Sequence, residues 1–226
     1  SSLESSVPGK GNFDKETIIQ RVYGGVTKSS VICLQCNNPS DTFEQFIDTE
    51  LVIIKYNFKE ISSNVDDLHK CFLHYCKSEV LRGDNKYNCS HCKKPNDSIK
   101  KITYEKRIFE IIIIVPRILI CHLKRFDSFR NKIKRHINFS TTLDLTSLVS
   151  DKGTSEKQIY NLISVIIHDG NSTKSGHYYC YIKHSNEIWY CMNDSIVYEV
   201  SEKIVLKQNP YLLFYEKKMS EFSPLD

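Results

Sequence analysis

The stretch from Ile159 to Asp194, IYNLISVIIHDGNSTKSGHYYCYIKHSNEIWYCMND, organises the rest of the chain. Its apolar and largely β-branched run Leu162 to Ile167 ends in His168-Asp169-Gly170, which predicts a buried strand stopped by a turn. A polar loop follows, and the side chains then alternate from Gly176 to Lys183 as in a half-buried strand. We therefore expect His177 to lie where a flexible loop enters a rigid strand.

A further strand, Ile188 to Cys191, is expected to return antiparallel to the strand that follows His177. This return would bring Asn193-Asp194 close to His177. Imidazole serves as a general base near neutral pH, and it works best when a hydrogen bond fixes one ring nitrogen. Gly176, which has no side chain, would let a substrate backbone pass close to the ring. The alternative interpretation is that His177 merely begins a strand.

Length and composition limit the class of protein. With 226 residues and 40% apolar content, the chain can bury one sizeable core and form one domain. The formal charge of +4 is only mildly basic, so we expect no nucleic acid partner. Apolar runs such as Ile111 to Val115 are far shorter than the roughly 20 residues of a membrane span, and the polar Ser1 to Asp14 predicts no signal peptide.

Residues 1–17 are rich in serine, glycine and charge, so we expect a disordered linker or tag remnant that precedes a folded part over residues 18–226. The nine cysteines are odd in number and include two C-x-x-C pairs, which argues against a secreted disulfide framework. A reducing compartment, the cytoplasm or the nucleus, fits this pattern better.

The two C-x-x-C pairs follow apolar or aromatic residues that resemble strand ends. Two such knuckles supply four thiolates in a tetrahedral array, as in a structural zinc site, and we favour zinc over unpaired structural thiols. The expected ligands are Cys33, Cys36, Cys89 and Cys92. Each second cysteine is followed by a residue other than the usual glycine, and Lys93 tolerates a left-handed backbone less readily than Asn37. We therefore expect a looser second knuckle, with His91 pointing to solvent.

The remaining segments predict strands and one helix. Thr42 to Ile54 is rich in β-branched and aromatic residues, which predicts a strand, and the apolar spacing from Leu68 to Cys76 predicts a helix. Further strands are expected over Lys101 to Ile114, Arg117 to Phe126 and Ile133 to Leu145. The basic cluster Lys132, Lys134, Arg135 and His136 has no interleaved aromatics, so we interpret it as a solvated strand face rather than a nucleic acid contact.

Several motifs together resemble the ubiquitin-specific proteases, a family of cysteine deubiquitinases. They are H-D-G at 168–170, G-H-Y-x-x-Y at 176–181, W-Y-x-x-N-D-S-x-V at 189–197, the terminal YLLFY at 211–215 and ILICHLKRF at 118–126. The segment with the two C-x-x-C pairs is similar to the zinc-bearing fingers lobe of that family. The resemblance spans about residues 18–216.

The resemblance implies an α+β, papain-like fold with mostly antiparallel strands and few helices, divided into fingers at about 27–105 and a palm at about 106–216. It implies that His177 is the general base, that Asn193 orients it and that Asp194 assists. Gly176 and Tyr178 would contact the substrate, and the loops 127–132 and 169–176 would line the channel for its tail. The implied partners are ubiquitin or ubiquitinated proteins, with structural zinc as the cofactor.

One departure from the family concerns the nucleophile. The family carries its cysteine in an N-terminal box of the type G-x-x-N-x-G-N-T-C-Y, followed by a helical thumb lobe, and no stretch of this chain matches that box. We do not expect Cys121, Cys180 or Cys191 to replace the missing nucleophile. A nucleophilic thiolate needs exposure and a neighbouring cation or helix N-terminus. The chain alone is therefore expected to be inactive and to need the missing thumb.

Two alternatives remain open from the sequence. The first is a non-catalytic protein that binds ubiquitin or another partner as a scaffold and keeps the zinc ribbon. The second, a zinc-ribbon module for nucleic acid, would need a wider basic surface than a net charge of +4 provides.

Overall fold

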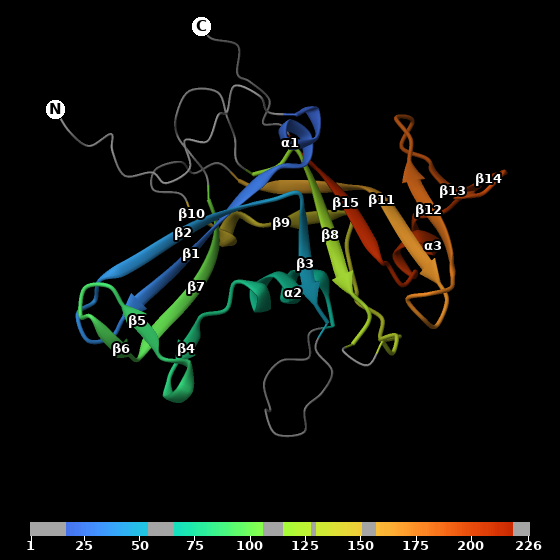
Figure 1. The fold of residues 1–226 in the computed structure, drawn as a ribbon. Coiled ribbons are helices and arrows are strands. Elements are labelled where there is room, and N and C mark those ends of the chain that lie inside the picture. The colour runs from blue at the N-terminus through green and yellow to red at the C-terminus, as the bar shows by residue number, and fades with distance from the viewer. Residues whose placement is uncertain (1–16, 54–65, 106–114, 128–129, 151–156, 219–226) are drawn as a thin grey trace, which may run out of the picture. The chain divides into compact units, whose positions relative to one another are not determined.

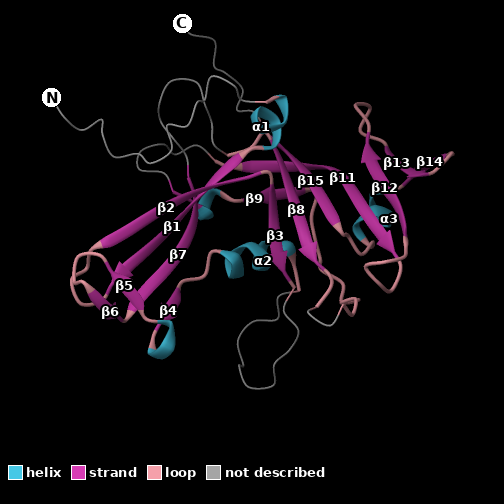
Figure 2. Ribbon diagram, in the orientation of Figure 1, coloured by secondary structure: helices cyan, strands magenta, loops and turns pink. Residues whose placement is uncertain are grey.

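A computed structural model describes residues 17–53, 66–105, 115–127, 130–150 and 157–218. The chain divides into two compact units, each with its own sheet (Figure 1). The first unit is built from Ser1–Ile47, Cys76–Pro116 and Leu148–Thr154, and the second from Asp48–Tyr75, Arg117–Ser147 and Ser155–Asp226. Strands dominate both units and the helices are short (Figure 2), as the predicted α+β class requires.

The first unit contains a five-stranded sheet with the order β10-β7-β1-β2, and β4 pairs with β7. Its elements are α1 (Ile18–Tyr23), β1 (Gly25–Cys33), β2 (Pro39–Phe46), β4 (Glu79–Leu81), η2 (Gly83–Asn85), β5 (Tyr87–Cys89), β6 (Lys94–Asn96), β7 (Ser98–Glu105) and β10 (Val149–Ser150). The pairs β1–β2 and β1–β7 are antiparallel, and β5 and β6 form a separate hairpin. The C-terminal end of β1 and the β5–β6 hairpin each carry one C-x-x-C pair.

The second unit contains an eight-stranded sheet with the order β14-β13-β12-β11-β15-β8-β3, and β9 pairs with β11. Its strands are β3 (Asp48–Val52), β8 (Ile118–Lys124), β9 (Thr142–Asp144), β11 (Ile159–Asp169), β12 (His177–Lys183), β13 (Trp189–Asn193), β14 (Ile196–Val200) and β15 (Leu212–Lys217). Its helices are α2 (Leu68–Tyr75) and α3 (Glu202–Leu206), and the short η3 spans Thr146–Leu148. All of these pairs are antiparallel except β3–β8.

The core of the second unit forms around β11, which lies between β12 and β15. Alternate residues of β11, including Tyr160 and Leu162, are buried because neighbouring side chains of a strand point to opposite faces. Tyr215 on β15 is fully buried as well, and its hydroxyl donates a hydrogen bond of 2.7 Å to the carbonyl of Ser140. These buried side chains anchor β11 in the sheet, and the loop before His177 follows its last residue.

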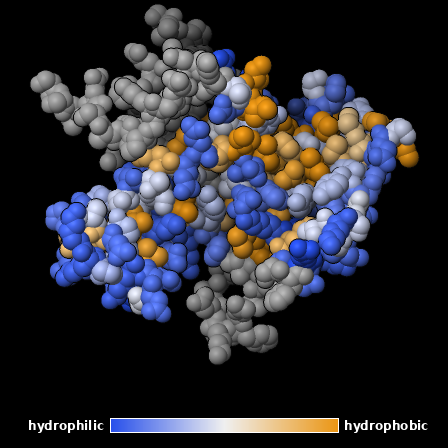
Figure 3. All heavy atoms as spheres, viewed as in Figure 1, coloured by the Kyte–Doolittle hydropathy of each residue, from blue (hydrophilic) through white to orange (hydrophobic). Residues whose placement is uncertain are grey.

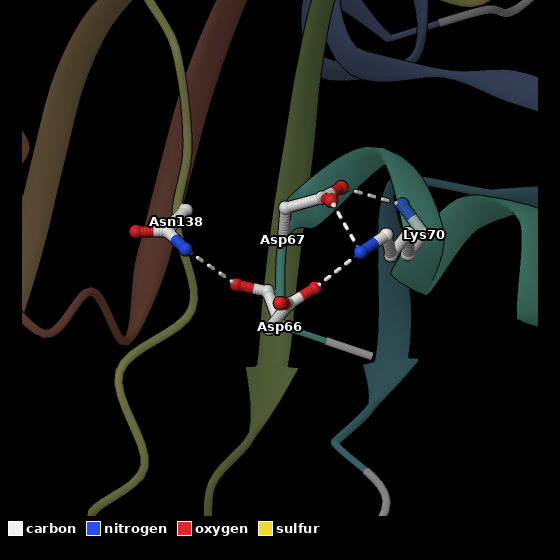
Figure 4. A network of polar contacts seen from close by, with 4 residues as sticks. All are labelled: Asp66, Asp67, Lys70 and Asn138. Atoms are coloured by element: carbon white, nitrogen blue, oxygen red, sulfur yellow. Dashed lines mark hydrogen bonds and ion pairs between the residues drawn. The ribbon is translucent and has the colours of Figure 1, made fainter. Parts of the chain in front are cut away.

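Helix α2 begins beside a polar network that Figure 4 shows. Oδ1 of Asp67 accepts a hydrogen bond of 2.8 Å from the backbone N–H of Lys70, which satisfies one of the free amides of the first turn. The ammonium of Lys70 lies 2.6 Å from Oδ1 of Asp66, whose carbonyl accepts from the side-chain amide of Asn138 at 3.1 Å. The helix predicted from Leu68 onward is present and ends at Tyr75.

Two predicted strands differ from the structure. Thr42 to Ile54 holds two strands, β2 and β3, because the chain leaves the first sheet at the exposed Ile47 and enters the second. Ile133 to Leu145 is mostly irregular and contains only the short β9. The alternating apolar residues there anchor a loop, whose carbonyls at Ile133 and Arg135 accept hydrogen bonds from a buried guanidinium rather than from a neighbouring strand.

The other strands lie near their predicted places. The strand predicted over Arg117 to Phe126 is β8, and the one predicted from Lys101 corresponds to β7, while residues 106–114 lie outside the described residues. None of the helices in the described ranges combines the length and apolar character that a membrane crossing needs. Apolar side chains reach the surface at the outer strand β14 (Figure 3), where Ile196, Val197 and Tyr198 are all exposed.

Candidate functional site

His177 is the first residue of β12 and pairs with Asp169 at the end of β11. The two strands and the loop expected from the sequence are present, and the strands pair as a hairpin with its loop at residues 170–176. Antiparallel pairing between β12 and β13 begins at Cys180 and Met192, and β13 ends at Asn193. The side chain of His177 is about half exposed, with 47% of its surface accessible. A reacting group can therefore reach the ring from solvent.

Asn193 is the partner of the imidazole. Nε2 of His177 lies 2.5 Å from Oδ1 of Asn193, while Oδ2 of Asp194 lies farther away, at 3.9 Å. Because an amide oxygen can only accept, Nε2 carries the proton, and Nδ1 is left as the basic nitrogen. Asp194 has a φ of 53° in the turn between β13 and β14, a left-handed conformation that Asp tolerates better than most residues.

Gly176 lies against a second histidine. A Cβ added at Gly176 would come within 2.1 Å of Nε2 of His168 and 2.8 Å of the carbonyl of Asp169. His168 is 5% exposed, and its ring centroid lies 4.7 Å from that of the exposed Tyr178. Burial and the nearby charge of Lys132 lower the pKa of His168, so its ring is neutral at neutral pH. His168 thus supports the residues immediately before and after His177 from inside the domain.

The solvated face predicted for the basic cluster is wrong for Lys132. Its ammonium donates hydrogen bonds to the carbonyls of His168 at 2.5 Å and Gly170 at 2.8 Å. His136 is also engaged, with Nδ1 3.1 Å from Oδ1 of Asn209, whereas Lys134 is exposed. The sequence indicates His168 only as part of a turn, and these contacts could not be predicted from it. The one available signal was a polar residue at the end of an otherwise buried strand.

The cysteines of the second unit offer no activated thiol within the described residues. Cys71, Cys121 and Cys191 are buried, and Cys180 is half-buried. Desolvation raises the pKa of the Cys121 and Cys180 thiols, which disfavours the nucleophilic thiolate.

Four of the five cysteines of the first unit form a compact cluster. The Sγ atoms of Cys33, Cys36, Cys89 and Cys92 all lie within 4.8 Å of one another. The Cys36–Cys89 pair is separated by 3.7 Å and the Cys33–Cys92 pair by 4.0 Å. Four sulfurs about 2.3 Å from a central ion in a tetrahedron would be about 3.8 Å apart, so the cluster has the dimensions of a metal site. His91 is exposed and is not part of it.

Both knuckles close in the same way. Asn37 and Lys93 have φ values of 56° and 57°, and their N–H groups donate to the carbonyls of Cys33 and Cys89, each at 2.8 Å. Lysine at this position therefore adopts the left-handed conformation as asparagine does, and the looser second knuckle that the sequence suggested is not seen in these contacts.

Comparisons with known proteins agree on one family. The family model described as ubiquitin carboxyl-terminal hydrolase matches residues 1–215. Ubiquitin carboxyl-terminal hydrolase 23 of Arabidopsis thaliana is 33% identical over 227 residues, covering 99% of this chain and 24% of that protein. Ubiquitin carboxyl-terminal hydrolase 42 of Homo sapiens is 35% identical over 212 residues, covering 92% and 15%.

A solved structure with a similar fold is that of the SAGA Ubp8/Sgf11/Sus1/Sgf73 DUB module bound to ubiquitin aldehyde. It superposes with a TM-score of 0.77 at 29% identity, over 94% of this chain and 45% of that one. The chain therefore spans less than half the length of each of these three proteins.

Proposed function

The chain belongs to the ubiquitin carboxyl-terminal hydrolase family, and we propose that it supplies the general-base half of a cysteine-type deubiquitinase. The observation that carries this proposal is the 2.5 Å contact between Nε2 of His177 and Oδ1 of Asn193, next to an open approach to the ring. A histidine held by an amide in this way is the arrangement that accepts a proton from a thiol.

In the proposed reaction His177 takes the proton of a cysteine thiol, and the thiolate attacks the carbonyl carbon of the C-terminal glycine of ubiquitin. The C–N bond breaks, the amine leaves with the proton from the imidazolium, and a thioester remains. Water then attacks the thioester with His177 as base, releasing the ubiquitin carboxylate and regenerating the thiol. Asn193 keeps the ring oriented throughout, and Asp194 assists from 3.9 Å.

The substrate is proposed to be ubiquitin or a ubiquitinated protein. The names of the relatives support this substrate, as does the ubiquitin aldehyde bound to the similar DUB module. We propose that Gly176 and Tyr178, with the loops 127–132 and 169–176, line the channel for the ubiquitin tail. Gly176 suits this role because its exposed backbone carries no side chain.

The cysteine nucleophile is proposed to come from an N-terminal box and thumb, since no described thiol of the second unit is activated. Exposed apolar residues on β14, among them Ile196 and Val197, would pack against such a segment. The proposed domain boundaries are fingers at about 27–105 and a palm at about 106–216, after a linker at 1–17. All nine cysteines are free, which supports a reducing location, cytoplasmic or nuclear.

The chain alone is expected to form no covalent adduct with a ubiquitin derivative that carries an electrophile at its C-terminus. Intact-mass spectrometry of the 226-residue chain after incubation with this probe measures the outcome. The same chain with the nucleophile-bearing segment supplied should gain the mass of one ubiquitin. Adduct at Cys180 or Cys191 of the isolated chain would contradict the assignment, and absence of adduct after supplying the segment would favour a non-catalytic ubiquitin-binding scaffold.

We propose that the metal held by the four-cysteine cluster is zinc. Thiolate ligands in a tetrahedral, closed arrangement suit this ion, and the Sγ separations of 3.7 Å and 4.0 Å agree with it. When bound, zinc would supply structural cross-linking of β1 with the β5–β6 hairpin. The residues holding it would be Cys33, Cys36, Cys89 and Cys92.

Replacing one ligand is expected to remove the ion. Cys89→Ser should lower the zinc content from about one ion per chain to near zero by elemental analysis, because three thiolates hold zinc far less tightly than four. The first unit should become protease-sensitive while the sheet around His177 stays folded. Cys76→Ser is the matched control, a buried cysteine outside the cluster that should leave the zinc content unchanged. Equal zinc in both variants would refute the site.

A further inference from the structure

A pocket in the second unit is lined in part by His168, Asp169 and Gly170, at the end of β11. It has a volume of about 380 Å³, and its lining includes Arg125, Lys132, Lys134, Lys207 and a single carboxylate, Asp169. Four cations therefore face one anion in this pocket. Pockets of this size accommodate a small molecule rather than a lone ion.

Arg125 supplies a buried charge to this pocket. Only 1% of the residue is exposed, and its guanidinium donates to the carbonyls of Pro210, Ile133 and Arg135 at 2.5, 3.1 and 2.8 Å. Among the described residues, Nη2 has no hydrogen-bond partner. A buried cation held only by neutral carbonyls lacks the counter-charge that normally offsets its desolvation.

The pKa of the Lys132 ammonium is affected by the neighbouring positive charges. Burial lowers the pKa of its ammonium, and repulsion from Arg125 and Lys134 lowers it further, with Asp169 opposing the shift. Burial likewise lowers the pKa of Arg125 to about 10. The pocket is lined by more cationic than acidic side chains, and a bound anion would relieve the repulsion among them.

We propose that this pocket, bounded by Arg125, Lys134 and Lys207, binds a small molecule that carries phosphate groups. Guanidinium and ammonium groups are the usual partners of phosphate oxygens, and the volume accommodates more than one phosphate. Asp169 and Gly170 line the same pocket and begin the loop 169–176 that is proposed above to line the channel for the ubiquitin tail, so the pocket borders that proposed channel. A bound phosphate compound would therefore contact the segment that positions the general base.

Isothermal titration of the 226-residue chain with pyrophosphate tests the proposal. We expect saturable binding that weakens as salt is raised, because the contacts are ionic. Lys134→Ala and Lys207→Ala should each weaken binding about tenfold, and the double variant more, since each removes one charged hydrogen-bond donor. Both lysines are exposed, so the variants should fold as the parent does.

Lys203→Ala is the matched control. Lys203 lies in α3, four residues before Lys207, and carries the same charge. It does not line the pocket. The affinity of this variant for pyrophosphate should equal that of the parent. All variants keep the four knuckle cysteines, so chelation of a metal would affect them equally. No saturable binding by the parent, or equal binding by the parent and the double variant, would overturn the proposal, and neither outcome bears on His177.

Discussion

His177→Ala should abolish nearly all ubiquitin hydrolysis by the proposed assembled enzyme, in which a nucleophile-bearing segment would complete this chain. Without the imidazole nothing accepts the thiol proton or returns it to the leaving amine, and general acid–base catalysis of this kind contributes about 10² to 10⁴ in rate. We expect a loss at or above the top of that range, because the histidine also activates the nucleophile. Steady-state cleavage of a fluorogenic ubiquitin substrate measures the loss.

The matched control is His184→Ala. His184 is an exposed histidine that directly follows the other end of β12, and its described contacts are with its own turn and Tyr190. His184→Ala removes the same kind of side chain away from the site, so it should keep parental activity and the parental melting temperature. Parental activity in His177→Ala itself would refute the assignment of this site and with it the proposed function.

Replacing Asn193 and replacing Asp194 should lower the rate of hydrolysis to different extents. Asn193→Ala removes the 2.5 Å contact that sets the ring orientation, whereas Asp194 lies at 3.9 Å. Asn193→Ala should therefore lower the rate more than Asp194→Ala, but less than His177→Ala, because the carboxylate can take over part of the orienting role. Removing both should approach the loss caused by His177→Ala. Such non-additivity is expected of groups that act on one imidazole.

The proximity of His177 and Asn193 was predictable because the two residues lie close together in the sequence. Alternation of side chains located β12, the polar turns located its ends, and antiparallel return of β13 then brought Asn193 toward His177. The C-x-x-C spacing located the four cysteines for a similar reason, since each pair is a local turn. Their conformation was less predictable, because Lys93 takes a left-handed φ that its own preference disfavours.

Contacts between segments that lie far apart in the sequence could not be predicted from local sequence patterns. Lys132 bonds to the carbonyl of His168, which lies 36 residues away in the sequence, and no local pattern indicates such a pair. The same limit explains the strand wrongly predicted over Ile133 to Leu145. Its apolar alternation is real, with Ile133 and Ile137 buried, but Arg125 satisfies its carbonyls where a neighbouring strand would have been needed.

His168 gives Gly176 a role that the sequence did not indicate. The described glycines with positive φ are Gly83 and Gly170, so Gly176 does not owe its place to a left-handed backbone. It is required because a side chain there would meet the His168 ring at 2.1 Å and the carbonyl of Asp169 at 2.8 Å. His168 is held by ring contacts to Phe126 and Tyr178, so it cannot simply rotate away.

Gly176→Ala should therefore shift the start of β12 and separate His177 from Asn193. A displacement of about 1 Å at a catalytic group costs on the order of 100-fold in rate, whereas overpacking of this kind costs about 1–3 kcal/mol of stability. We expect the rate of the assembled enzyme to fall by about two orders of magnitude while the chain remains folded. The drop should lie mainly in kcat, with the melting temperature measured in parallel.

Gly83→Ala is the matched control, since nothing lies within 4 Å of an added Cβ there and only the φ of 61° opposes it. It should cost about 1 kcal/mol of stability and leave the rate unchanged. Adding His168→Ala to Gly176→Ala removes the closest contact, at 2.1 Å, but leaves the carbonyl of Asp169, so partial recovery of the rate is expected. A Gly176→Ala enzyme as active as the parent would show that the ring of His168 yields freely and that it does not position His177.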